Sequence, residues 1–181
     1  MIYRTFRVHR LLTLIFAFGT LCSAGCSPLI LADPLSPYDG YELEANVPYG
    51  IHRRQKLDIY EPLTEENKEI IIMFIYGGSW RSGERSNYRF IAPPFVSQGY
   101  TTIVPDYRLY PEIQFPGFVD DIAKAMVWTH RRYEQKNNPR KIILIGHSAG
   151  AHIVALLALD NRYLKRAGAS TKIINGWVSL A

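Results

Sequence analysis

The sequence predicts one α/β domain with a mainly parallel sheet, preceded by an N-terminal leader. Three observations support this fold class. Apolar runs of strand length alternate with stretches of helical periodicity, a glycine-rich loop follows one of these runs, and another run leads directly into a helix rich in Ala and Leu. Alternating strands and helices indicate parallel pairing, and in such sheets the ligand site lies at the carboxyl ends of the strands.

Length and composition are those of one globular domain. The 181 residues are 48% hydrophobic and 20% charged, which excludes disordered, collagen-like and coiled-coil classes. The net charge of +5 includes three arginines in the first ten residues, and from Cys26 onward 18 basic residues stand against 16 acidic ones. No basic cluster with interleaved aromatic residues occurs, so we expect no nucleic-acid binding. The two cysteines, Cys22 and Cys26, are too few for a disulfide framework or a cysteine zinc site.

The first 25 residues have the order of a secretory signal. Met1–Arg10 is basic, Leu11–Leu21 is apolar but too short for a permanent membrane helix, and small residues precede Cys26. Ser-Ala-Gly-Cys resembles the bacterial lipobox, in which the cysteine becomes the lipidated first residue, although Ser23 stands where a lipobox usually has Leu. We expect a lipoprotein of the bacterial cell envelope, anchored to membrane lipid through Cys26 and facing the periplasm or the exterior. Plain secretion and an uncleaved anchor are the alternatives.

A proline-containing linker is expected over residues 26–45, followed by the folded domain over residues 46–181. Alternation in Lys56–Tyr60 predicts half of an early hairpin, with Leu57 and Ile59 on one face. Apolar runs predict four more strands, at Ile70–Ile75, Thr101–Val104, Ile142–Ile145 and Ile173–Leu180. Two helices are predicted, at Val119–Val127 from its i, i+3, i+4, i+7, i+8 spacing and at Ala149–Leu159.

The strongest chemical signal is Gly146-His147-Ser148-Ala149-Gly150, which lies between the Ile142–Ile145 strand and the Ala149–Leu159 helix. This is the G-x-S-x-G pattern in the strand–turn–helix context of a nucleophilic serine. Gly146 and Gly150 relieve clashes in the sharp turn, and Ser148 is expected to be exposed at the sheet edge. The helix N-terminus favours the negative charge that develops during attack. A structural serine turn is the alternative.

The second signal is Tyr76-Gly77-Gly78-Ser79-Trp80, at the end of the Ile70–Ile75 strand. Glycines here let backbone N–H groups turn toward a ligand oxygen. A phosphate-binding loop is disfavoured because Gly-Lys-Ser/Thr is absent. We assign the oxyanion hole to the backbone N–H groups of Gly78, Ser79 and Ala149. A merely tight turn is the alternative, and Trp80 either lines an acyl pocket or is a buried aromatic residue.

Four motifs occur in an order that resembles the α/β-hydrolase superfamily. They are LDIYEP at 57–62, YGGSW at 76–80, DYRLYPE at 106–112 and GHSAGAH at 146–152. The resemblance runs from about Val47 to the last residue and points to the esterase branch near feruloyl-esterase-like (BD-FAE), kynurenine-formamidase-like and hormone-sensitive-lipase enzymes. It implies an α/β-hydrolase fold and Ser-His-Asp cleavage of small carboxylic esters, without metal or organic cofactor. An arylformamidase acting on an amide, and a tethered pseudo-hydrolase that only binds ligands, are the alternatives.

Two departures from the family pattern matter. Tyr76 stands where the glycine loop normally begins with His, so the loop must be held with a different geometry. In this fold the acid and the histidine follow the serine. In this sequence the only histidine after Ser148 is His152, and the only acidic residue after it is Asp160. We interpret His152 as structural. We therefore expect an N-terminal fragment, truncated before the last strands and inactive by itself, with the acid and histidine beyond residue 181.

The remaining charged residues are expected to have structural roles. Asp120 and Asp121 open the Val119–Val127 helix, where they compensate the helix dipole. Arg108 and Glu112 are expected to form structural pairs. The five histidines show no metal-binding spacing, so we expect no metal site.

Overall fold

The computed structural model describes residues 40–64 and 68–181. The expected signal over residues 1–25, the lipidation site at Cys26 and most of the linker lie outside these ranges. The described strands are β1 (Tyr41–Pro48), β2 (Lys56–Pro62), β3 (Lys68–Ile75), β4 (Tyr100–Pro105), β5 (Lys141–His147) and β6 (Gly176–Leu180). The helices are η3 (Arg85–Ile91), α2 (Ala92–Val96), α3 (Gly117–Gln135), α4 (Ala149–Leu159), α5 (Asn161–Arg166) and η4 (Thr171–Ile173), of which η3 and η4 are 3-10 helices.

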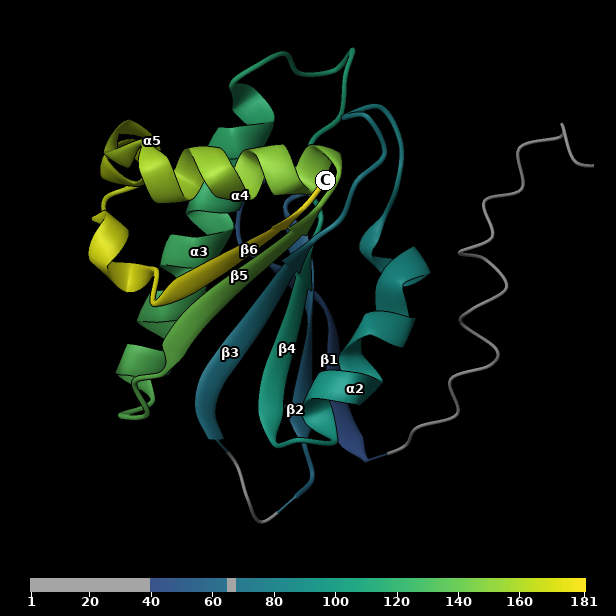
Figure 1. Cartoon of the computed structure of the whole chain (residues 1–181), viewed down its shortest axis with the longest axis vertical. Helices are drawn as coiled ribbons and strands as arrows, with labels where there is room; N and C mark the ends of the chain where they lie inside the picture. The colour runs from purple at the N-terminus through teal and green to yellow at the C-terminus, as the bar shows by residue number, and fades with distance from the viewer. Residues whose placement is uncertain (1–39, 65–67) are drawn as a thin grey trace, which may run out of the picture.

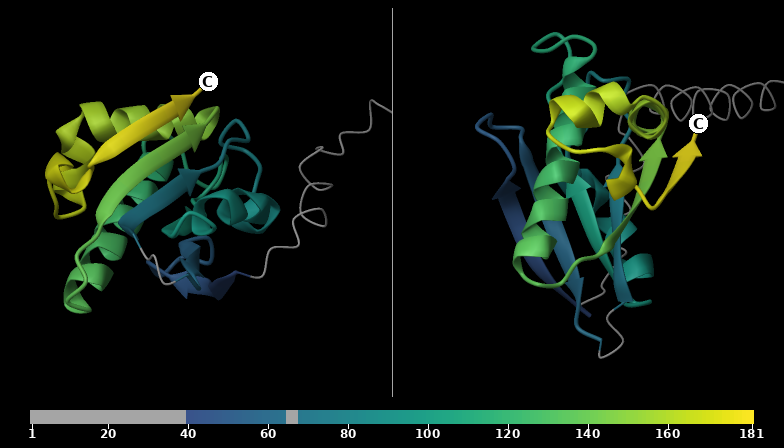
Figure 2. Two further views of the ribbon diagram at one scale, coloured as in Figure 1. Left: turned by 60° about the horizontal axis from the view of Figure 1, so that its bottom comes forward. Right: turned by 90° about the vertical axis from the view of Figure 1, so that its left-hand side faces the viewer.

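The strands form one sheet in the order β1-β2-β4-β3-β5-β6. The four strands β4, β3, β5 and β6 pair in parallel, while β1 and β2 add an antiparallel edge. Helices α3, α4 and α5 lie on one side of this sheet and α2 on the other (Figures 1 and 2). The mainly parallel α/β sheet predicted from the sequence is confirmed. Because parallel strands end at the same edge, the loops after β3 and β5 meet there.

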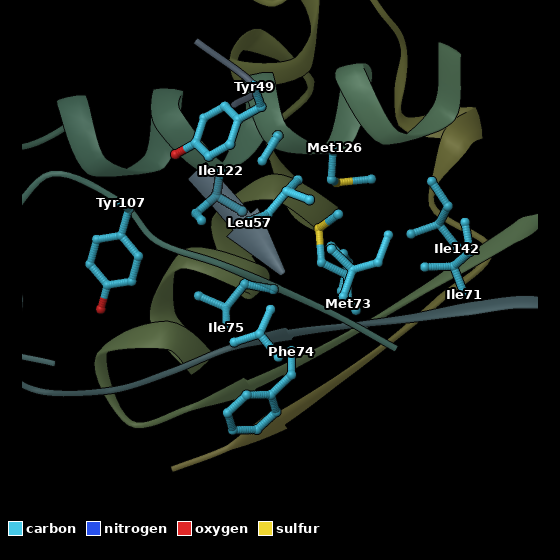
Figure 3. Packing of buried hydrophobic residues seen from close by; sticks show 14 of the residues in the cluster. Tyr49, Leu57, Ile71, Met73, Phe74, Ile75, Tyr107, Ile122, Met126 and Ile142 are labelled. Carbon is cyan, nitrogen blue, oxygen red and sulfur yellow. The ribbon is translucent and has the colours of Figure 1, made fainter. Parts of the chain in front are cut away.

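The apolar run of β3 lies in the middle of the molecule. Ile71 to Ile75 are all buried, as expected of a strand covered on both faces. Met73 lies on the side of Met126 from α3, whereas Phe74 points to the opposite side (Figure 3). There the Phe74 ring meets Tyr88, with ring centroids 5.7 Å apart. Both helical layers are therefore held to the sheet by alternate residues of one strand.

The predicted hairpin is present, since β1 and β2 pair antiparallel. Leu57 and Ile59 of β2 are fully buried, but Asp58 on the opposite face is only 2% exposed. Asp58 accepts a hydrogen bond from Arg85 Nε at 2.8 Å. The strand is therefore buried on both faces, with a paired carboxylate on one of them.

Several element boundaries differ from the predictions. Residues 41–45 belong to β1 and not to the linker. In this strand Glu42 and Leu43 pair with Glu61 and Tyr60 of β2. The last strand begins at Gly176 and not at Ile173, which ends the 3-10 helix η4. Helices α2 and α5 are short and were not predicted. Within residues 40–64 and 68–181, no helix has the length and apolar character needed to cross a membrane.

Candidate active site

Ser148 occupies the sharp turn between β5 and α4. Its backbone has φ 52° and ψ −117°, a left-handed conformation that is costly for a residue with a side chain. The amide of Ser148 donates to the carbonyl of Leu180 at 2.8 Å, which fixes the turn to the neighbouring strand β6. The Ser148 side chain is exposed at the carboxyl edge of the sheet. Strand, turn and helix are those predicted for this motif.

The two glycines of the motif are required by close backbone contacts. A Cβ atom on Gly146 would lie 2.4 Å from the carbonyl oxygen of Gly150. A Cβ atom on Gly150 would lie 2.1 Å from the carbonyl oxygen of Ile75 and 2.7 Å from that of Tyr76. Helix α4 therefore starts in direct contact with the end of β3. This contact sets the distance between Ser148 and the glycine loop.

The glycine loop after β3 lies against the serine turn. A Cβ atom on Gly77 would be only 3.0 Å from Ser148 Cβ and 3.0 Å from the carbonyl oxygen of His147. The next three residues, Gly78, Ser79 and Trp80, all have positive φ, at 117°, 52° and 58°. The structure thus brings together the two segments from which the oxyanion hole was predicted.

The amides assigned to the oxyanion hole remain free to bind a ligand. Within the described part of the chain, the N–H groups of Gly78, Ser79 and Ala149 donate to no backbone or side-chain acceptor. Ala149 is also the first residue of α4, where the helix dipole adds partial positive charge. Unpaired donors at a helix N-terminus favour a developing oxyanion. Their assignment to the oxyanion hole stays a prediction.

Aromatic rings form a wall beside the serine turn. Trp80 stacks on Phe118 with ring centroids 5.8 Å apart, and Phe115 tilts against Phe118 at 6.0 Å. The His152 ring meets Trp80 edge-on at 5.5 Å and Phe115 at 6.4 Å. His152 is thus a side-chain neighbour of this wall, and within the described residues it forms no hydrogen bond with the Ser148 hydroxyl. These contacts support the structural interpretation of His152.

Tyr76, which replaces the usual histidine of the loop, is fully buried. Its hydroxyl donates to Asp106 Oδ1 at 2.6 Å, and its carbonyl oxygen accepts from the Tyr107 hydroxyl at 2.9 Å. Its ring stacks on Tyr88 and Tyr107, with centroids 5.0 and 4.8 Å away. The sequence indicated a different geometry at this position but gave no partner for the tyrosine.

Asp121 has a different role from the one predicted. Its side chain is fully buried and accepts two hydrogen bonds from the Arg108 guanidinium at 2.8 and 2.7 Å and one from Gln55 at 2.8 Å. Burial raises the pKa of Asp121, but the bonds from Arg108 outweigh burial, so the pKa lies below its usual value. The expected pairing of Arg108 is present, and Asp121 is its partner. Asp120 remains in the first turn of α3 and pairs with Arg166.

Two hollows lie away from Ser148. One of about 470 Å³ is at the amino ends of β3 and β5, lined by residues that include Ile70 and Lys141. The other, of about 520 Å³, lies along α3 and includes Lys124 and Trp128. Among the described residues, no group of three or more His, Cys, Asp and Glu side chains is arranged to hold a metal ion.

Comparison with known proteins decides the family. The BD-FAE family model matches residues 57–173, which include the glycine loop and the serine turn. The chain belongs to the BD-FAE family. This BD-FAE chain is 30% identical to the kynurenine formamidase of Salmo salar over 112 residues. The aligned region covers 62% of the chain and 37% of the relative. It is 25% identical over 130 residues to a probable isoprenylcysteine alpha-carbonyl methylesterase of Arabidopsis thaliana, covering 71% of the chain and 31% of the relative.

The fold is that of α/β-hydrolase esterases. Among solved structures, esterase B of Lactobacillus rhamnosis aligns with a TM-score of 0.69 at 22% identity, over 93% of this BD-FAE chain and 55% of that one. The α/β-hydrolase fold predicted from four motifs is confirmed. The chain spans only about a third of the length of the two curated relatives and about half of esterase B.

Proposed function

We propose that this BD-FAE chain carries the nucleophile and the oxyanion hole of a serine hydrolase that cleaves small carboxylic esters. The observation that carries the proposal is the strained, exposed Ser148 between β5 and α4, with Gly77 packed against it. Such a turn exposes the serine at the sheet edge beside free backbone donors. The ester-cleaving and formamide-cleaving relatives support a hydrolase.

The proposed reaction follows from this geometry. A histidine base takes the Ser148 proton as its Oγ attacks the ester carbonyl carbon. The carbonyl oxygen becomes an oxyanion, which accepts hydrogen bonds from the amides of Gly78, Ser79 and Ala149. When the oxyanion collapses, the ester C–O bond breaks and the base gives its proton to the departing alkoxide oxygen. Water, which loses a proton to the same base, then attacks the acyl-enzyme, releases the carboxylic acid and leaves Ser148 protonated again. In this proposal a histidine and an acid outside the described residues complete the Ser-His-Asp set, and the reaction requires no metal or cofactor.

The rings of Trp80 and Phe115 both meet the ring of His152, which lies one helical turn after Ser148 on α4. Flat, apolar side chains favour a flat or apolar group on the substrate. An arylformamidase is the second candidate because the kynurenine formamidase of Salmo salar is a relative. Ester and formamide cleavage use the same nucleophile and oxyanion hole.

The test is to measure, in parallel, how fast the full-length gene product turns over p-nitrophenyl acetate and N-formylkynurenine. We expect ester hydrolysis that Ser148→Ala lowers on the order of 10⁴-fold or more. Ser97→Ala is the matched control, because Ser97 lies just after α2 and its exposed hydroxyl donates to the Pro94 carbonyl at 3.1 Å. Faster turnover of the formamide would assign the arylformamidase. No turnover of either, with retained ligand binding, would assign the pseudo-hydrolase.

We further propose that the protein is exported and anchored to membrane lipid through Cys26. The support is the order of basic, apolar and small residues before this cysteine. In this proposal the enzyme acts in the cell envelope on small molecules that reach the membrane surface.

A further inference from the structure

The side chain of Arg54 forms hydrogen bonds at both ends of the loop from Gly77 to Glu84. Arg54 Nη2 donates to the Tyr76 hydroxyl at 3.0 Å and to the Gly83 carbonyl at 2.6 Å. Tyr76 directly precedes the loop, and Gly83 lies near its end. The guanidinium therefore joins the two ends of the segment that contains the oxyanion amides. Arg54 Nε also donates to the Tyr107 carbonyl at 2.9 Å, which fixes the arginine itself.

A carboxylate makes a second connection between the same ends. Asp106 Oδ1 accepts from the Tyr76 hydroxyl at 2.6 Å and from the Arg85 amide at 2.7 Å. Asp106 Oδ2 accepts from the Arg85 guanidinium. The Tyr76 hydroxyl thus donates to Asp106 and accepts from Arg54, so both of its hydrogen-bonding roles are used. Charge-assisted bonds of this kind are among the stronger ones in proteins.

The Tyr76 ring fits tightly beneath the loop. It lies between Tyr88 and Tyr107, with interplanar angles of 12° and 23°. A Cβ atom on Gly83 would lie 2.9 Å from Tyr76 Cε2, so the returning loop rests directly on the ring. Burial, followed by the charge of Asp106, raises the pKa of Tyr76 well above its ordinary value. The hydroxyl therefore remains a donor at any physiological pH.

The loop needs this support because its backbone is strained. Three consecutive positive φ angles at Gly78, Ser79 and Trp80 include two non-glycine residues. Conformations of this kind are costly for residues that carry a side chain and persist only where the surroundings fix them. Inside the loop, Gly78 O accepts from the Arg81 and Ser82 amides at 2.9 and 3.1 Å. These local bonds close the turn but do not hold it against the sheet.

We propose that Tyr76 is a positioning residue for the oxyanion hole, which it serves by tying both ends of the Gly77–Glu84 loop to Arg54 and Asp106. The inference rests on the proposed function. Donors that are fixed before the reaction stabilise a transition state without a reorganisation cost. A displacement of about 1 Å at such a site can lower a rate on the order of 10²-fold. Tyr76 acts through the backbone of Gly78 and Ser79 and does not touch the substrate.

The test is Tyr76→Phe in the full-length gene product. Phe keeps the stacked ring but removes the hydroxyl, and we expect kcat to fall on the order of 10- to 100-fold with KM changed less than threefold. Tyr133→Phe is the matched control. The Tyr133 hydroxyl also donates to a carboxylate, that of Glu61, but it lies on α3, away from Ser148. Its variant is expected to lose stability and to keep kcat.

Thionoester substrates separate positioning from general destabilisation. A sulfur acceptor binds hydrogen-bond donors weakly, so a thionoester gains less than its oxoester from well-placed amides. In Tyr76→Phe we expect the oxoester rate to fall more than the thionoester rate, which lowers the preference for oxoester. In Tyr133→Phe this preference should equal that of the wild type. An unchanged kcat and an unchanged preference in Tyr76→Phe would overturn the proposal.

Amide hydrogen exchange measures the loop without any catalysis. We expect the peptide covering residues 77–84 to exchange faster in Tyr76→Phe than in the wild type and in Tyr133→Phe. Equal exchange in all three proteins would overturn the proposal even if the enzyme is active. If the wild type shows no Ser148-dependent hydrolysis, the proposed function fails, and faster exchange would still establish that Tyr76 holds the loop.

Discussion

At the residue scale, the site depends on contacts that leave no room for an additional atom. Gly150 lets α4 start directly against the carbonyl groups of Ile75 and Tyr76. The motif Gly146–Gly150 could be recognised in the sequence because its residues are consecutive. The partners of Tyr76 and Asp121 could not, because Asp106 lies 30 positions after Tyr76 and Arg108 lies 13 before Asp121. Only the fold brings these pairs together.

Gly150→Ala should destabilise the protein through backbone overpacking. The new Cβ would lie 2.1 Å from a carbonyl oxygen, and neither backbone segment can move without shifting the strand or the helix. We expect a loss of about 1–3 kcal/mol or more in the free energy of unfolding, measured by urea denaturation. Ala158→Ser, near the end of the same helix, is the control and should change this free energy by less than about 1 kcal/mol. A stable Gly150→Ala protein would contradict the packing described for the turn.

Asp121→Asn should cost about 3–5 kcal/mol, because it leaves the Arg108 charge partly buried without its counter-ion. The folded-state pKa of Asp121 is lowered, so its contribution to stability is full above the unfolded value of about 3.9 and is lost as pH falls through the folded value. The unfolding free energy of the wild type should therefore drop below about pH 4, and Asp121→Asn should flatten this drop. Asp120→Asn breaks a more exposed pair and should cost at most about 1 kcal/mol. Parallel pH profiles for wild type and Asp121→Asn would count against the pair.

At the element scale, hydrophobic pattern predicts the long elements well. The apolar run at 70–75 corresponds to β3, because a strand buried on both faces needs consecutive apolar residues. The spacing at 119–127 corresponds to α3, because a helix buried along one stripe needs apolar residues every three or four positions. Short elements were missed because they depend on local bonds. Asp160 caps the N-terminus of α5, because its side chain accepts a hydrogen bond from the Arg162 amide at 3.0 Å. This capping residue directly follows the last residue of α4. Strand β1 is largely exposed, so no apolar run marks it.

Strand β6 forms one edge of the described sheet and exposes apolar side chains. Trp177, Val178 and Leu180 are 41%, 44% and 48% exposed. Exposed apolar edge strands pair with other chains, so we expect the 181-residue polypeptide to self-associate. Val178→Lys should reduce this association in light scattering, while Gln98→Lys adds the same charge at an exposed turn and should not. Equal scattering by both variants would exclude β6 as the contact.

At the scale of the whole molecule, the sequence predicts an exported leader before the folded domain. If Cys26 is lipidated, the wild type should incorporate labelled palmitate and partition into detergent, whereas Cys26→Ser should do neither. Two or three acyl chains, each CH₂ contributing about 0.8 kcal/mol, anchor a protein essentially permanently. Cys22→Ser is the control, because that cysteine precedes the expected cleavage site. A soluble wild type beginning at Ser27 or later would instead indicate ordinary secretion.

The central claim, that Ser148 is the nucleophile of a hydrolase, is tested most directly by covalent labelling. A fluorophosphonate probe reacts with a serine whose hydroxyl is activated and whose oxyanion hole is formed. Incubated with the full-length gene product and mapped by mass spectrometry, the probe should modify the peptide that contains Ser148 and no other, and Ser148→Ala should abolish labelling. Modification of a different serine, or labelling that persists in Ser148→Ala, would contradict the claim.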